Sequence, residues 1–145
     1  KSNVLPQSVK ATINYRIRPG DTSQAVLEHV RKVVADDSLR VGIAQGSAVE
    51  PSPVSDSHAP VFTTVAQTIL SIFPDAIVAP SLMIGASDGR HFVKVADSVY
   101  RFVPFVLEPD DLLRLHGKNE RIKVADYQRM IRFYAQLIKN VDATK

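Results

Sequence analysis

The chain has 145 residues, enough for one ordinary domain or two small ones, and 45% of them are hydrophobic, as in a typical globular protein. Its 18 basic and 15 acidic residues are interspersed, and the net charge of +3 gives no long field of one sign to attract nucleic acid. The chain has no cysteine and no apolar run close to the roughly 20 residues of a membrane span. We therefore expect no nucleic-acid or membrane partner in this segment, and any metal must be held by His, Asp or Glu.

The first predicted element is a strand over residues 9–17, where apolar and polar side chains alternate. A period of two is typical of a strand with one buried face and one wet face. Pro19-Gly20 ends the alternation. Asp21 with Gln24 then predicts a capping box for a helix that reaches about Asp36.

A second alternating stretch, residues 39–43, predicts another strand after this helix. The first part of the chain is therefore expected to form a β-α-β unit, which is too small to be stable alone. Prolines and small polar residues dominate residues 51–57, and this composition predicts a linker. We accordingly expect two domains, residues 1–50 and 58–145.

The second predicted domain begins with a helix from Ser57 to Phe73, because apolar residues recur there at helical spacing. Residues 76–84 and 99–106 are continuous short apolar runs, which suit strands covered on both faces. Residues 124–141 predict a final amphipathic helix. Together these elements predict the α/β fold class.

Few residues of the chain are suited to chemistry. None of the four histidines forms a metal-ligand pair with another by spacing alone. His116 is distinctive because it lies in Leu-His-Gly-Lys-Asn-Glu, in a loop beyond a predicted buried strand, where α/β enzymes carry their chemistry. The structural alternative is a tight turn at Gly117 and Asn119, with Glu120 capping the last helix. Residues 87–90, Ser-Asp-Gly-Arg, likewise follow a predicted strand, and their alternative is a helix N-cap with a surface arginine.

Taken in order, these motifs resemble the C-terminal half of the carboxypeptidase S and Gly-Xaa carboxypeptidase group, to which secreted N-acyl amino acid hydrolases also belong. This group is part of the aminoacylase superfamily of di-zinc exopeptidases and deacylases. The resemblance spans nearly the whole chain. It rests on Asn3-Val-Leu-Pro6, Ile13-Asn-Tyr-Arg-Ile-Arg-Pro-Gly20, Gly85-Ala-Ser-Asp-Gly-Arg-His-Phe92, Val99-Tyr-Arg-Phe-Val-Pro104 and Leu115-His-Gly-Lys-Asn-Glu120.

The resemblance implies a particular division of the chain. Residues 1–50 would be the second half of a ferredoxin-like lid, which is also the family's dimerisation domain. Residues 58–145 would be the final helix-strand-strand-helix part of the zinc-exopeptidase catalytic domain. The half-lid would leave strand edges unpaired, so we expect a homodimer through residues 8–45.

The resemblance also implies roles for individual residues. His116 matches the histidine that closes the second metal position, and two zinc ions are expected in the intact parent protein. Asn3 and Arg16 match the lid pair that binds the substrate's terminal carboxylate. Arg90 matches a polar residue of the substrate pocket, and Gly85 lies where the backbone approaches the scissile group.

The family's other metal ligands and its general base would lie upstream, so we expect no catalytic base in this segment and no activity of the segment alone. The parent's substrate would be a small peptide or an N-acyl amino acid, cleaved at an amide next to a free carboxylate. Gly89 departs from the Ser or Thr common in the carboxypeptidase S group, and Ser-Asp-Gly-Arg is closer to the succinyl-diaminopimelate desuccinylases. A desuccinylase-like deacylase and a non-catalytic dimerisation module therefore stand as alternatives.

Overall fold

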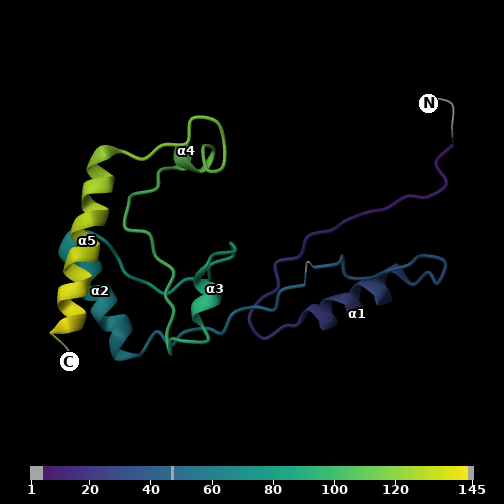
Figure 1. Ribbon diagram of the computed structural model, residues 1–145, viewed down its shortest axis with the longest axis horizontal. Helices are drawn as coiled ribbons and strands as arrows, with labels where there is room; N and C mark the ends of the chain where they lie inside the picture. The colour runs from purple at the N-terminus through teal and green to yellow at the C-terminus, as the bar shows by residue number, and fades with distance from the viewer. Residues whose placement is uncertain (1–4, 47, 144–145) are drawn as a thin grey trace. The chain divides into compact units, whose positions relative to one another are not determined.

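The computed structural model describes residues 5–46 and 48–143. The chain divides between Pro53 and Val54 into two compact units, which we describe separately as unit 1 and unit 2. Five helices, and no strand, are present in the described residues (Figure 1). The α/β class therefore stays a prediction, since the stretches expected to be strands do not pair into a sheet within the described residues.

Unit 1 contains one helix, α1 (Ser23–Val34). The Thr22 hydroxyl accepts a hydrogen bond of 3.1 Å from the amide of Ala25, the third helical residue. The predicted capping box of Asp21 and Gln24 is wrong, because the Thr22 hydroxyl occupies the cap position one residue later. The Gln24 side chain instead donates along the helix surface.

The helix ends two residues earlier than the predicted Asp36. Ala35 takes a left-handed conformation with φ 46°, and its amide bonds to the Arg31 carbonyl oxygen at 2.9 Å. Such a residue terminates a helix because it turns the chain while satisfying one of the last free carbonyls. Asp36 begins the following turn, where its carboxylate accepts from the amide and hydroxyl of Ser38, and these bonds lower the pKa of Asp36.

A long-range polar contact holds the end of unit 1 to the start of α1. The Glu50 carboxylate accepts from the Ser23 amide at 3.1 Å and from the Ser23 hydroxyl. These bonds lower the pKa of Glu50, with the hydroxyl bond the larger cause. An acidic group at this place also favours the helix, because the N-terminus of a helix carries a partial positive charge. Unit 1 is therefore organised by polar contacts, and α1 has no buried residue.

The predicted strands of unit 1 leave their apolar side chains in solvent. Val9 is 91% exposed, Ile13 65% and Ile43 46%. Neither residues 9–17 nor residues 39–43 pair in a sheet within the described part of the unit. The β-α-β arrangement stays a prediction for a chain in which these faces are covered.

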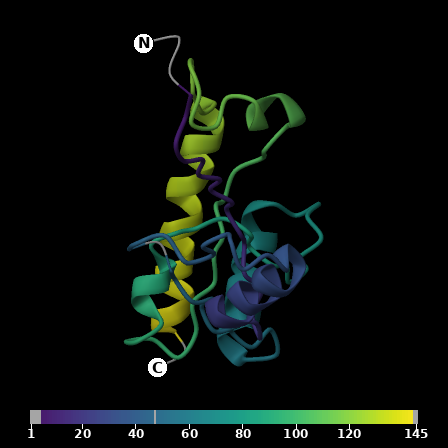
Figure 2. The same ribbon diagram turned by 90° about the vertical axis from the view of Figure 1, so that its right-hand side faces the viewer.

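Unit 2 is built on two helices that pack side by side, α2 (Pro60–Ile72) and α5 (Val124–Asp142) (Figures 1 and 2). Both helices confirm the predictions made from apolar spacing, and Pro60 lies in the first turn of α2, where its missing N–H costs nothing. Ile69 of α2 and Phe133 of α5 are buried. Phe133 also meets the ring of Phe102 at a centroid distance of 5.3 Å.

One buried polar bond fixes the register of these helices. The Thr68 hydroxyl is fully buried; it donates to the Thr64 carbonyl oxygen at 2.7 Å and accepts from the Asn140 amide group at 2.8 Å. A buried hydroxyl without partners would destabilise the fold, so this bond favours one alignment of α5 on α2 over shifted ones.

Two short helices, α3 (Gly89–Phe92) and α4 (Pro109–Leu112), complete unit 2. The apolar runs 76–84 and 99–106 contain no assigned strand, so their prediction as strands also remains open. None of the helices in the described ranges combines the length and apolarity that crossing a membrane demands.

Phe133→Ala should remove the cooperative unfolding of unit 2. Phe133 is 2% exposed, and truncating a buried phenylalanine costs about 3 to 5 kcal/mol, much of what a small unit has. Urea denaturation followed by circular dichroism measures the change. Ile138→Ala, on the same helix at a residue that is 64% exposed, should shift the midpoint little. Equal losses for the two variants would contradict this account of the core.

Candidate functional site

Residues 99–102 form the segment on which the candidate site of unit 2 is assembled. Val99 is held through both backbone groups by Ser55: its amide donates to the Ser55 hydroxyl oxygen at 2.8 Å, and its carbonyl lies 3.2 Å from the same hydroxyl. The Tyr100 hydroxyl donates to the Asp56 carbonyl oxygen at 2.6 Å. The segment preceding α2 is therefore fastened to residues 99 and 100.

Successive side chains of this segment point to different neighbours. The Tyr100 ring meets Phe62 of α2 edge-on at 5.4 Å, and the Phe102 ring packs on Phe133 of α5. Arg101, between them, donates from Nε to the Ser87 hydroxyl at 2.9 Å. This alternation places the aromatic rings on the helices and the guanidinium on the loop that contains Arg90.

The predicted substrate residues of this loop are exposed. Gly85 and Arg90 both lie at the surface, and the Arg90 Nε donates to the ring of His91 at 3.2 Å. The short helix α3 begins at Gly89, and its N-cap Asp88 makes no side-chain capping bond. The alternative interpretation of this motif, a helix N-cap with a surface arginine, agrees with the structure, since Asp88 is the N-cap of α3 and Arg90 is exposed.

His116 lies in a tight turn with unusual backbone angles. Its φ is 59° and that of Asn119 is 65°, whereas Gly117 is not in the left-handed region. The His116 amide donates to the Glu120 carboxylate at 3.3 Å. The alternative in which Glu120 caps the last helix is wrong, because the carboxylate bonds back into the turn and Lys123 is the N-cap of α5. The imidazole itself is exposed.

The acidic turn before His116 is already occupied by cationic and backbone partners. Asp111 accepts from the Glu108 amide at 3.0 Å and pairs with Arg114, and these bonds lower its pKa, the amide bond most. Glu108 pairs with Lys123, and this bond raises the pKa of the lysine. Neither carboxylate is available as a metal ligand unless it gives up these bonds.

A metal centre is not assembled by the residues that the structure describes. No group of three or more His, Asp or Glu side chains comes together within residues 5–46 and 48–143. A neutral imidazole is a good zinc ligand, but a catalytic zinc takes about three protein ligands. His116 alone does not provide that number of ligands among the described residues.

The three predicted site residues of unit 2, Gly85, Arg90 and His116, are not joined by any described polar contact. No hydrogen bond or ion pair in the described part of unit 2 joins His116 to Gly85 or Arg90. Arg16 is exposed in unit 1, and Asn3 lies outside the described residues.

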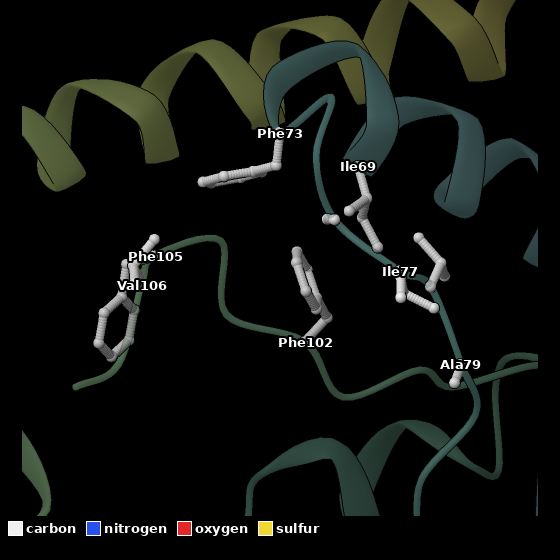
Figure 3. A pocket seen from close by; sticks show the side chains of 9 residues that line it. Ile69, Phe73, Ile77, Ala79, Phe102, Phe105 and Val106 are labelled. Atoms are coloured by element: carbon white, nitrogen blue, oxygen red, sulfur yellow. The ribbon is translucent and has the colours of Figure 1, made fainter. Parts of the chain in front are cut away.

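A cavity of about 270 Å³ lies between the end of α2 and the two apolar runs (Figure 3). Figure 3 shows the Phe102 ring rising toward the space beside Phe73 and Ile69. Every side chain around it is apolar, so the cavity offers no group for proton transfer or metal binding. Its lining consists of Ile69, Phe73, Ala76, Ile77, Val78, Ala79, Phe102, Phe105 and Val106.

Sequence reasoning missed the polar anchors Ser55, Ser87 and Arg101. Their motifs were noticed, but hydrogen bonds between residues 14 and 44 positions apart have no local signal. The alternation of Tyr, Arg and Phe at residues 100–102 was the available hint, because it is the pattern of a segment with two different faces.

Residues 6–140 match the model of the peptidase family M20/M25/M40. The chain therefore belongs to this family. It is 41% identical over 142 residues to a probable carboxypeptidase S-like 2 of Dictyostelium discoideum, covering 98% of this chain and 27% of that protein. It is 41% identical over 145 residues to the human N-fatty-acyl-amino acid synthase/hydrolase PM20D1, covering 98% of this chain and 28% of that one.

Carboxypeptidase S of Saccharomyces cerevisiae is a more distant relative, 26% identical over 171 residues, with 98% of this chain and 30% of the yeast protein covered. No solved structure matches the chain. The chain thus spans between a quarter and a third of the length of these relatives. The resemblance found from the motifs is confirmed at the level of the family.

The chain by itself should bind zinc only weakly, because a catalytic zinc takes about three protein ligands and His116 supplies one. Calorimetric titration with zinc should show no 1:1 binding of submicromolar affinity. His29→Ala, which removes an exposed histidine of α1, is the control for His116→Ala. Tight 1:1 binding that His116→Ala abolishes and His29→Ala preserves would mean that the chain holds a complete site.

Proposed function

We propose that this chain is the C-terminal part of a zinc-dependent exopeptidase or amidohydrolase that cleaves an amide next to a free carboxylate. The observation that carries the proposal is the family match over residues 6–140, which includes the Ser-Asp-Gly-Arg and His-Gly-Lys-Asn-Glu motifs. The relatives are named carboxypeptidases and N-fatty-acyl-amino acid hydrolases, and both names describe hydrolysis of such an amide. The substrate would be a small peptide or an N-acyl amino acid.

In this proposal His116 is a metal ligand. His116 is exposed on a turn with a left-handed backbone, so its ring could bind a metal ion whose other ligands come from another part of the enzyme. Zinc, when bound, supplies a Lewis acid and a water of lowered pKa. The hydrogen bond from the His116 backbone amide to the Glu120 carboxylate stabilises the turn that carries the ring. The remaining ligands and the general base would come from upstream, so the chain alone would be inactive.

Arg16 and Asn3 would bind the substrate's carboxylate. A planar guanidinium holds a carboxylate through two parallel hydrogen bonds, and the Arg16 side chain is exposed and without an ion pair among the described residues of unit 1. Arg90 and Gly85 would line the pocket near the scissile bond. Residues 1–50 would be the lid half and residues 58–145 the catalytic half, joined by the linker 51–57.

The α/β fold belongs to this proposal as well. In the complete enzyme, residues 76–84 and 99–106 would pair as strands and the α2–α5 pair would cover one face of their sheet. The two-sided alternation of residues 100–102 supports this, since a strand presents neighbouring side chains to opposite faces. A desuccinylase-like deacylase remains the second candidate, because Gly89 makes residues 87–90 Ser-Asp-Gly-Arg, the motif that is closer to the desuccinylases.

The complete protein would be a homodimer through residues 8–45. Val9, Ile13 and Tyr15 share one side of the alternation; Val9 and Ile13 are largely exposed in unit 1, and Tyr15 is about half exposed. Apolar area removed from water contributes about 25 cal/mol per Å², so covering this face with a second copy is favourable.

In the complete enzyme, Arg16→Lys should raise KM about tenfold while lowering kcat much less. Lysine keeps the charge but loses the two-pronged hydrogen bonding, and tenfold corresponds to about 1.4 kcal/mol. Steady-state kinetics on an N-acyl amino acid measures the effect, with Arg18→Lys, two positions along the same face, as the control. C-terminally amidated substrates should be poor for the parent enzyme. If they are cleaved as fast as free acids, Arg16 does not bind the carboxylate.

The chain should sediment as a dimer at micromolar concentration, and Ile13→Lys should convert it to a monomer. A lysine at residue 13 places a charge in the middle of the apolar face that the second copy covers. Sedimentation equilibrium is the measurement, and Ile138→Lys, on α5 of unit 2, should leave the dimer intact. If the unsubstituted chain is strictly monomeric, this interface is ruled out.

A further inference from the structure

Arg101 is the residue through which the buried part of unit 2 reaches the loop 85–90. Its Nε donates to the Ser87 hydroxyl at 2.9 Å, and both side chains are half-buried. Ser87 begins the first of two overlapping backbone turns, in which the Arg90 amide donates to the Ser87 carbonyl oxygen at 3.3 Å. Asp88 begins the second, in which the His91 amide donates to the Asp88 carbonyl oxygen at 2.9 Å. The position of Ser87 therefore affects the position of Arg90.

The residues on either side of Arg101 are fixed. Val99 is bonded through both backbone groups to Ser55, and the Tyr100 hydroxyl bonds to a backbone carbonyl while its ring packs on Phe62. Phe102 packs on the buried Phe133 of α5. Arg101 is thus a donor on an anchored segment, whereas the loop it meets has no anchoring cap of its own.

Gly89 provides the space for this bond. A Cβ at residue 89 would lie 3.0 Å from Arg101 Nε, 3.2 Å from Ser87 Oγ and 3.4 Å from Val99 Cγ1. The added atom would therefore crowd the donor and the acceptor of the same hydrogen bond. By contrast, a Cβ at Gly42 would meet nothing within 4 Å.

We propose that Arg101 is a positioning residue that holds the substrate loop 85–90 through Ser87, and that Gly89 is the residue that permits this bond. A glycine at position 89 and an arginine at position 101 therefore act as a pair. A larger residue at 89 displaces the guanidinium and frees the loop. The part of this inference that concerns catalysis rests on the proposed function, because it needs Arg90 to meet the substrate.

The bond itself is tested on the chain as it stands. The Nε–H of Arg101 gives its own nitrogen-correlated NMR signal, and its hydrogen exchange should become about three- to tenfold faster in Ser87→Ala, as expected for the loss of one intramolecular hydrogen bond. Ser87→Thr, which keeps the hydroxyl, should restore slow exchange. Gly89→Ala should accelerate exchange like Ser87→Ala, and Gly42→Ala should not. Unchanged exchange in Ser87→Ala, with the fold retained, would overturn the proposal.

The consequence for catalysis is tested in the complete enzyme. Ser87→Ala and Arg101→Ala should each raise KM by a factor of about three to ten with a smaller change in kcat, and the double variant should be no worse than either single one. Ser87→Thr should match the parent, as should Arg132→Ala on the exposed face of α5. A double variant whose losses multiply, or an unchanged KM, would overturn the positioning role.

These two tests separate this inference from the proposed function. An enzyme that hydrolyses no amide would end the proposed function, and the Nε–H signal would then decide whether Arg101 holds the loop. An active enzyme with slow Nε–H exchange in Ser87→Ala would leave the proposed function intact and end the inference.

Discussion

The order of unit 2 depends on the way residues 99–102 are held. Ser55 bonds to both backbone groups of Val99, and the two aromatic rings that follow pack on α2 and α5. Without these contacts the segment would have no partner among regular elements, because the described residues contain no sheet to receive it. With them, an irregular stretch acquires two distinct faces, one toward the helices and one toward the loop of Arg90.

Polar contacts fix geometry in both units, while apolar burial is sparse. In unit 1, Glu50 bonds to the first residue of α1, and in unit 2 a fully buried threonine bonds across to Asn140. Many large apolar side chains remain exposed, among them Val9, Ile77 and Leu113. Apolar burial is the dominant favourable term in folding. Covering these exposed apolar side chains would therefore stabilise the chain more than its present internal contacts do.

The same argument explains why the candidate site is dispersed. His116 stands on a turn supported by Glu120, and the nearby Glu108 and Asp111 are committed to Lys123 and Arg114. A zinc site needs several ligands that converge, and convergence requires elements that flank one another in a complete core. The chain spans between a quarter and a third of the length of the relatives that it matches.

The sequence by itself was sufficient for the family and for the long helices α2 and α5, because apolar spacing and short motifs are local properties. It failed on the N-terminal cap of α1 and on the role of Glu120, where several side chains could reach the same backbone group and only the chain's path selected Thr22 and the His116 amide. The bonds of Ser55 to Val99 and of Arg101 to Ser87, and the space at Gly89, were decided by tertiary structure alone. They join residues far apart in the chain, and no periodicity specifies which distant hydroxyl will meet which donor.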